Sequence, residues 1–174
     1  KGHATMGFFS RLMGGSDEQT TAASEFEILA PVSGELVHLE NTNDPAFSSR
    51  AVGDGVAVVP QEGTVCAPVS GTVAALFPTE HALGIMSDDS SAQVMLHIGI
   101  DTVKLEGKAS SAVAQGDHVD AGQPLVEVDF DAVRAADFDP TVFVIVCERS
   151  ENSTLREHAS GPVAAKEPVI WLSE

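Results

Sequence analysis

The residues best suited to chemistry in this chain are two histidines, His81 and His97. A neutral imidazole is a nucleophile for phosphoryl transfer when a partner fixes its ring and donors meet the transferred oxygens. Its unperturbed pKa of about 6.5 leaves a useful neutral fraction near neutral pH. His97 ends an apolar run and, in strand alternation, shares a face with Met95 and Gly99. Gly99 would leave room for the backbone of a second protein to approach.

The histidine spacing alone does not assign a function. A histidine on an apolar strand is more often a hydrogen-bonded packing residue than a reactive one. His81 follows Pro78-Thr79-Glu80, which predicts a turn after the strand ending at Phe77. His97 and Asp101 also have the H-x-x-x-D spacing of lysostaphin-type zinc peptidases. No H-x-H in the sequence supplies the third protein ligand that catalytic zinc normally takes, which disfavours that class.

The composition predicts one acidic, globular domain. A length of 174 residues suits a single domain, and 9 Lys+Arg against 26 Asp+Glu give a net charge of −17. That charge excludes nucleic acid and favours a basic protein partner. Neither a signal peptide nor an apolar stretch of about 18 residues is present, so a cytoplasmic location is expected.

Three segments divide the chain. Residues 1–5 read as an expression remnant before a natural start at Met6, and 25–174 read as one domain. Residues 6–24 are predicted to be flexible, with at most peripheral membrane contact. The apolar residues of that segment recur at helical spacing: Phe8, Phe9, Leu12 and Met13.

The elements that must position the histidines are short strands separated by turn residues, a pattern typical of all-β proteins. The predicted strands are 35–39, 55–59, 71–77, 93–98, 124–128, 141–147 and 169–172. Only 131–136 and 110–114 are candidate helices.

An internal repeat sharpens the fold prediction. Ala30-Pro31-Val32-Ser33-Gly34-Glu35-Leu36-Val37 recurs as Ala67-Pro68-Val69-Ser70-Gly71-Thr72-Val73-Ala74. In each copy an extended X-Pro segment enters a Ser-Gly turn and then a strand. Duplication predicts two halves that cover each other's apolar faces. The expected fold is a compact antiparallel β-sandwich with internal pseudo-symmetry and few short helices.

Several motifs, in order along the chain, resemble one known family. His97-Ile98-Gly99-Ile100-Asp101-Thr102-Val103 is similar to the phosphorylation-site segment H-[FI]-G-[IL]-D-T-V of the glucose-type IIA components of bacterial sugar phosphotransferase systems. Phe77-Pro78-Thr79-Glu80-His81-Ala82 resembles that family's second-histidine segment. Ala51-Val52-Gly53-Asp54-Gly55-Val56-Ala57 and Ile28-Leu29-Ala30-Pro31-Val32-Ser33-Gly34 match its glycine turn and its opening strand. The similarity runs from Met6 to the C-terminus.

The resemblance implies a phosphotransferase that works through a phosphohistidine. His97 would accept a phosphoryl group on Nε2 from the histidine phosphocarrier protein HPr and pass it to a cysteine of a sugar-specific IIB domain. His81 would donate a hydrogen bond to the phosphoryl oxygens, and Thr79 would fix the His81 ring. Asp101 would orient nearby groups or repel phosphate, and the N–H groups of Ile100 and Asp101 would hold phosphate charge.

The resemblance also implies a partner surface, regulatory partners in some members and no required cofactor. A zinc ion at His81 and His97 would need a ligand from a partner. The implied partner surface consists of Phe47, Val52, Phe77, Met95, Ile98 and Val103. The sequence departs from the family pattern at Pro78, Met95, Ile98 and Lys104, positions expected on the partner-facing rim.

Two other functions stay open on the residues alone. One is a non-catalytic regulatory binding protein. The other is a biotinyl- or lipoyl-type carrier domain, suggested by the turn-strand element 116–128. Such domains carry a lysine at a hairpin tip beside Met or Asp, which neither Lys104 nor Lys108 fits.

Overall fold

The structure, a computed structural model, describes residues 25–102 and 107–174. The predictions for residues 1–5 and 6–24, and those for Val103 and Lys104, lie outside the described residues. The strands of the largest sheet are β2 (Gly34–His38), β3 (Asp54–Pro60), β5 (Gly71–Leu76), β6 (Ala82–Ser87), β7 (Ala92–Ile98), β9 (His118–Val119), β11 (Val142–Arg149) and β13 (Gly161–Val163). The strands of two smaller sheets are β1 (Phe26–Leu29), β4 (Thr64–Cys66), β8 (Ala109–Ser111), β10 (Pro124–Val128), β12 (Thr154–Glu157) and β14 (Pro168–Ser173).

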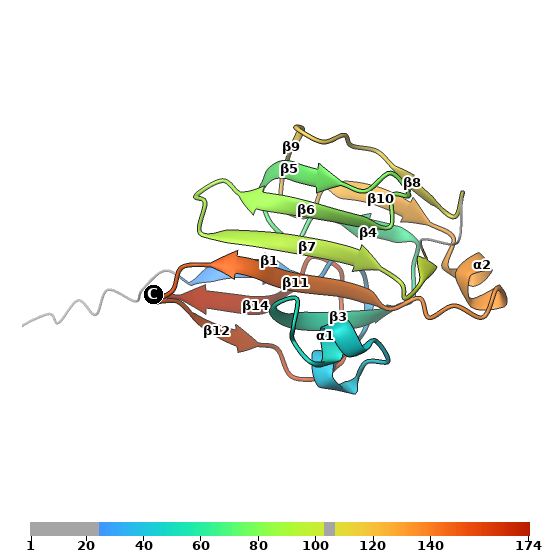
Figure 1. The fold of residues 1–174 in the computed structure, drawn as a ribbon, viewed down its shortest axis with the longest axis horizontal. Coiled ribbons are helices and arrows are strands. Elements are labelled where there is room, and N and C mark those ends of the chain that lie inside the picture. The colour runs from blue at the N-terminus through green and yellow to red at the C-terminus, as the bar shows by residue number, and fades with distance from the viewer. Residues whose placement is uncertain (1–24, 103–106) are drawn as a thin grey trace, which may run out of the picture.

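The sheets form a sandwich, as the sequence predicts. The eight-stranded sheet has the order β13-β2-β3-β11-β7-β6-β5-β9, and the small sheets have the orders β1-β14-β12 and β4-β10-β8. Figure 1 shows β5, β6, β7, β11 and β3 side by side, with the small sheets behind them. Each of these strand pairings is antiparallel. Within the described ranges, no helix has both the length and the apolar character to cross a membrane.

The two copies of the repeated segment are joined by backbone hydrogen bonds. The N–H of Leu29, just before the first copy, donates to the carbonyl of Pro68 in the second at 2.8 Å. The N–H of Cys66, just before the second copy, donates to the carbonyl of Pro31 in the first at 2.7 Å. This reciprocal exchange is what pseudo-two-fold symmetry requires, because each copy meets the other through the same atoms.

The serines of the two repeats play equivalent parts. The Ser33 hydroxyl accepts from the N–H of Ala165 at 2.9 Å. The Ser70 hydroxyl accepts from the N–H of Ala121 at 2.8 Å. Each Ser-Gly turn is therefore tied to the chain segment just before a strand of a small sheet. The pseudo-symmetry predicted from the repeat extends to its surroundings.

The predicted strands are all present, with ends shifted by up to two residues. The helix expected at 131–136 is α2 (Phe130–Ala135), whose N-cap Asp129 accepts from the N–H of Ala132 at 2.8 Å. The helix expected at 110–114 is wrong. Its first residues belong to β8, where Ser111 pairs with Val126 of β10. Five residues of helix would gain little hydrogen bonding, whereas a third strand completes a sheet.

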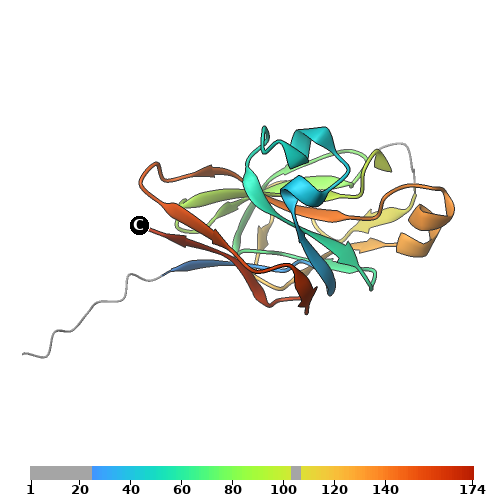
Figure 2. The same cartoon turned by 90° about the horizontal axis from the view of Figure 1, so that it is seen from below.

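A short helical segment on the outer face of the large sheet was not predicted from the sequence. It comprises η1 (Leu39–Asn41) and α1 (Pro45–Ser48), and Figure 2 shows it on the side of the sheet turned away from β1 and β14. The Asp44 side chain caps α1 by accepting from the N–H of Ala46 at 2.8 Å, and Pro45 opens the helix. The helix buries Phe47 in a second apolar cluster, which contains Leu39, Phe47, Ala57, Phe143 and Ile145.

The glycines of the repeats permit close backbone contact, which gives a test of the fold. A Cβ at Gly71 would lie 2.0 Å from the carbonyl oxygen of Met86, whereas a Cβ at Gly84 would meet nothing closer than 3.8 Å. We expect Gly71→Ala to lower the free energy of unfolding by about 1–3 kcal/mol, because the β5–β6 pairing must shift. Urea unfolding followed by fluorescence of Trp171 measures the change.

Gly84→Ala on the neighbouring strand is the matched control, and we expect it to leave the unfolding midpoint close to that of the parent chain. Equal midpoints for Gly71→Ala and the parent would contradict the described packing of β5 on β6.

Candidate functional site

His97 lies on β7 with its ring on the outer face of the large sheet. Its neighbours Leu96 and Ile98 are 0% and 2% exposed in the main core, whereas His97 is half-buried. Register places His97 opposite Ala82 of β6 and Phe143 of β11. The C-terminal end of β7 thus brings the ring to the end of the sandwich where α2 lies (Figure 1).

One hydrogen bond sets the chemistry of the His97 ring. Its Nδ1 lies 2.9 Å from the carbonyl oxygen of Gly99. A carbonyl only accepts, so Nδ1 carries the proton and donates it to this bond. A neutral imidazole has one N–H, which leaves Nε2 of His97 with a free lone pair.

Gly99 serves the backbone turn instead of leaving space for a partner, so that prediction is corrected. Its φ of +73° is in the left-handed region. A Cβ there would lie 2.2 Å from the Cγ2 of Thr102 and 3.0 Å from the carbonyl oxygen of Asp139. Only glycine lets the chain turn here and bring its carbonyl back to the His97 ring.

The N–H groups of Gly99 and Ile100 already have backbone partners. The N–H of Gly99 donates to the carbonyl of Thr141 at 2.8 Å, and that of Ile100 donates to the carbonyl of Asp139 at 2.9 Å. The expectation that the Ile100 amide holds phosphate charge is therefore wrong, because its hydrogen is committed to Asp139. Asp101 follows in a left-handed conformation, φ +59°, with an exposed side chain.

His81 reaches His97 from the turn before β6. The N–H of Glu80 donates to the carbonyl of Phe77 at 2.8 Å, and the N–H of Ile98 donates to the carbonyl of His81 at 2.7 Å. The ring centroids of His81 and His97 are 5.1 Å apart, with an interplanar angle of 85°. The structure thus brings together the two histidines that the sequence selects.

Thr79 lies beside the His81 ring, which it was expected to fix. Its hydroxyl makes a hydrogen bond with Nδ1 of His81. This contact leaves Nε2 of His81 free, as the Gly99 contact leaves Nε2 of His97 free. Two adjacent imidazoles are therefore each fixed through Nδ1.

Two residues assigned to the partner surface have other roles. Ile98 is 2% exposed in the main core, so it offers no contact area and that assignment is wrong. Phe47 is 5% exposed and packs beneath the His97 ring, at 5.1 Å between centroids, and on Phe143 at 4.2 Å. It supports the ring from below and contributes little outer surface.

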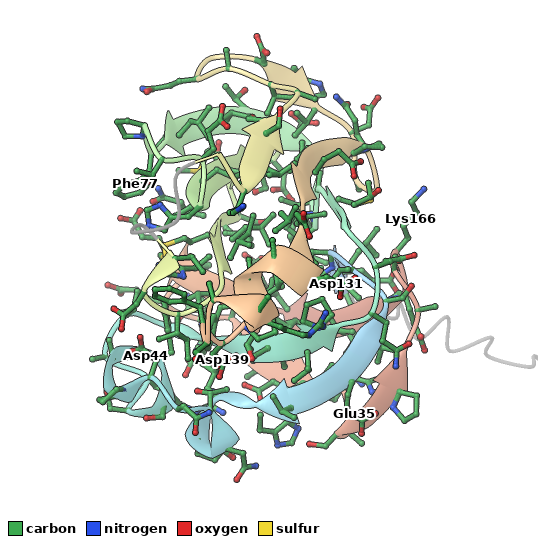
Figure 3. The ribbon with its side chains drawn as sticks, turned by 90° about the vertical axis from the view of Figure 1, so that its right-hand side faces the viewer. Glu35, Asp44, Phe77, Asp131, Asp139 and Lys166 are labelled. Carbon is green, nitrogen blue, oxygen red and sulfur yellow. The ribbon has the colours of Figure 1, made fainter. Side chains whose placement is uncertain are left out.

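The remaining residues of the predicted partner surface differ in exposure. Phe77 is 48% and Val52 38% exposed, and both are large apolar side chains in contact with solvent. Met95 is half-buried beside the second cluster, and Val103 lies outside the described residues. Figure 3 looks at this end of the molecule. It shows Phe77 at the upper left, and Asp44 and Asp139 at the lower left.

Burial controls the charge of the two histidines. Desolvation lowers the pKa of His97 most, and the neighbouring His81 lowers it further. The bond to Gly99 and the charge of Asp44 oppose this without cancelling it. Desolvation also lowers the pKa of His81. Both shifts favour the neutral rings, the form in which Nε2 of His97 is nucleophilic.

Among the described residues, the two histidines have no further metal ligand beside them. Within the described ranges no group of three or more His, Cys, Asp and Glu side chains is arranged to hold a metal ion. His81 and His97 supply two ring nitrogens, and catalytic zinc normally takes three protein ligands.

The structure adds two supporting residues that sequence reasoning missed. Phe143, opposite His97 on β11, forms the floor of the site, with centroids 6.2 Å apart. Asp139 holds the turn after His97 through its carbonyl. The Asp139-Pro140-Thr141 sequence is a turn signal that could have marked Asp139, whereas Phe143 reads as any strand residue.

The lowered pKa values predict how the rings titrate. Ring proton shifts followed by NMR should place the midpoint of His97 below about 6.5. His118 is the internal reference, because its hydrogen bond to Asp88 and then the charge of Asp88 raise its pKa. His81→Gln should raise the His97 midpoint, since it removes a like charge.

The same shift has a consequence for stability. A histidine with a lowered folded-state pKa binds fewer protons when folded, so stability is lost as pH falls below about 6.5 towards the folded-state pKa.

In the NMR titration, a His97 midpoint above that of His118 would contradict the described environment of the His97 ring.

Comparison with known proteins places this site in a family. Residues 26–152 match the family model of the phosphoenolpyruvate-dependent sugar phosphotransferase system, EIIA 1. The chain is 41% identical over 144 residues, 82% of its length, to a PTS system glucose-specific EIICBA component of Streptococcus pneumoniae, and covers 20% of that protein. It is 38% identical over 170 residues, 97% of its length, to a PTS system beta-glucoside-specific EIIBCA component of Bacillus subtilis, and covers 28% of that protein.

A solved structure agrees. Glucose permease IIA from Mycoplasma capricolum superposes with a TM-score of 0.77 at 33% identity, covering 85% of this chain and 96% of that one. The family model, over residues 26–152, includes both histidines and the strands that carry them. The chain belongs to the EIIA 1 family of the phosphoenolpyruvate-dependent sugar phosphotransferase system.

Proposed function

We propose that this chain carries a phosphoryl group on Nε2 of His97, accepts it from HPr and passes it to a cysteine of a IIB domain. The observation that supports the proposal is the bond between Nδ1 of His97 and the carbonyl of Gly99, which leaves the lone pair on Nε2 of this half-buried ring. The chain covers 20% and 28% of the length of the two relatives named above, whose names include B and C components.

The transfer balances with these groups alone. The Nε2 lone pair of His97 forms a bond to phosphorus while the N–P bond of the donor phosphohistidine breaks, and the donor imidazole keeps that electron pair. Nδ1 of His97 keeps its proton throughout and donates it to the carbonyl of Gly99. In the second transfer a cysteine thiolate attacks phosphorus, and the electron pair of the breaking P–N bond returns to Nε2.

His81 acts on the phosphoryl oxygens in this proposal. We assign the Thr79 hydroxyl as the donor to Nδ1 of His81, so that the ring proton is on Nε2. The two imidazole rings lie edge to face, with centroids 5.1 Å apart. An N–H aimed at developing oxyanion charge stabilises the transition state without reorganisation. Asp101, exposed on the turn after His97, adds a negative charge that favours departure of phosphate.

The surroundings of the site suit a basic donor protein. The net charge of −17 attracts such a partner over long range. Phe77 provides exposed apolar area beside His81, with ring centroids 5.7 Å apart, and Val52 is a second exposed apolar side chain. Zinc remains a proposal that needs a third ligand from the partner. Nε2 of His97 has a lone pair for it, whereas Nε2 of His81 would first have to lose its proton, with Nδ1 then donating to the Thr79 hydroxyl.

Phosphorylation by phosphoenolpyruvate, enzyme I and HPr, followed by intact mass, tests the function. We expect the parent chain to gain one acid-labile phosphate and His97→Ala to gain none. His81→Ala should still be phosphorylated but pass the group onward more slowly, on the order of 10²–10³-fold, because a charge-stabilising donor is lost.

His118→Ala is the matched control, since its exposed ring pairs with Asp88 and makes no contact with His81 or His97. It should behave as the parent chain does. No phosphate on the parent chain with an active donor pair, or undiminished phosphate on His97→Ala, would overturn the proposal.

A further inference from the structure

A turn at residues 139–141, just before β11, is organised by one carboxylate. Oδ1 of Asp139 accepts from the N–H of Thr141 at 2.9 Å and from the Thr141 hydroxyl. Thr141 is only 4% exposed, so its hydroxyl depends on this partner. Pro140 restricts Asp139 to an extended conformation, which presets the turn.

This turn holds the backbone that holds the His97 ring. The carbonyls of Thr141 and Asp139 accept from the N–H groups of Gly99 and Ile100 at 2.8 and 2.9 Å. The Gly99–Ile100 peptide group therefore donates to Asp139 through its N–H and accepts from Nδ1 of His97 through its carbonyl. Hydrogen bonds aligned in such a chain polarise and strengthen one another.

The other oxygen of the Asp139 carboxylate binds the residue just before helix α1, which packs against the His97 ring. Oδ2 of Asp139 accepts from Nδ2 of Asn43 at 3.1 Å. Asn43 immediately precedes the N-cap Asp44 of α1, the helix that places Phe47 beneath His97. Figure 3 shows Asp44 and Asp139 at this end of the molecule. One side chain thus connects the carbonyl that binds the ring with the helix that packs against it.

We propose that Asp139 is a positioning residue for His97, which keeps the Gly99 carbonyl and the Phe47 helix in place so that the ring stays in the Nδ1–H form with Nε2 outward. The functional consequence rests on the phosphocarrier function proposed above. The carboxylate acts through hydrogen bonds, because its oxygens are used by Thr141 and Asn43 and none contacts the His97 ring.

Two substitutions separate this role from a general effect of charge. Asp139→Ala removes both acceptors. Asp139→Asn loses the charge but keeps an oxygen for Thr141, and its NH2 can donate to Asn43 once the Asn43 amide rotates to present its oxygen. Long-range ¹H–¹⁵N NMR of the His97 ring reports which nitrogen carries the proton. We expect Asp139→Ala to show a mixture of the two ring forms and phosphorylation from HPr slowed roughly 10-fold. Asp139→Asn should recover most of both properties.

Asp131→Ala is the matched control, because it removes the same charge from an exposed site on α2. It should leave the ring spectrum unchanged. A parent-like ring spectrum and rate in Asp139→Ala would overturn the proposal, and so would equal impairment in Asp139→Asn, since charge would then be the cause.

Asn43→Ala keeps the test decisive if Asp139→Ala fails to fold. Asn43 is exposed and its substitution leaves the Asp139–Thr141 bonds in place. It should loosen the helix, broaden the His97 ring signals and slow phosphorylation by less than Asp139→Ala does. If Asn43→Ala left the His97 ring signals and the phosphorylation rate unchanged, the proposed link from Asp139 through Asn43 to helix α1 would be contradicted.

The ring spectrum also distinguishes failure of this inference from failure of the proposed function. If the parent chain takes no phosphate but the Asp139 variants still alter the ring form, only the phosphocarrier proposal fails. If the chain is phosphorylated and the ring form never changes, only the role of Asp139 fails.

Discussion

The hydrogen bond from Nδ1 of His97 to the carbonyl of Gly99 is the contact on which the site depends. It fixes the proton on one nitrogen and frees the other, which decides where a bond to phosphorus can form. The rest of the site holds the two ends of that bond. Strand pairing presents the ring between β6 and β11, and Phe47 packs beneath it. The left-handed conformation of Gly99 turns the carbonyl back towards the ring. Desolvation by these neighbours then keeps the ring neutral.

Hydrophobic periodicity predicts the strands that have one buried and one open face. Hydrophobic periodicity does not identify strands whose side chains do not alternate between buried and exposed. β6 (Ala82–Ser87) is almost continuously buried, so it shows no alternation, and β12 (Thr154–Glu157) is a polar edge strand. The pseudo-symmetry was predictable because both copies of the repeat keep the same Pro and Ser-Gly residues. The helix α1 was signalled only by Asp44-Pro45, a cap and a first-turn proline, which is too short a pattern to fix a four-residue helix.

For the site, sequence selects His97, His81 and Thr79, but their proximity depends on the register of β6 against β7, which no spacing reveals. The misplacement of Ile98 was avoidable, since period-two alternation puts it on the opposite face from His97. The use of the Ile100 amide could not be foreseen, because it depends on a turn some forty residues later, at 139–141. Long-range backbone contacts of this kind carry no local signature, whereas the residue types that do chemistry are visible at once.

The most direct test of this account asks which nitrogen of His97 carries phosphorus. Uniformly ¹⁵N-labelled chain, phosphorylated through HPr and kept at alkaline pH, would be examined by ³¹P-coupled ¹⁵N NMR of the histidine rings. The Gly99 contact predicts coupling at Nε2 of His97, with Nδ1 still protonated. Coupling at Nδ1, or on the ring of His81, would contradict the claim that one carbonyl directs the chemistry of this site.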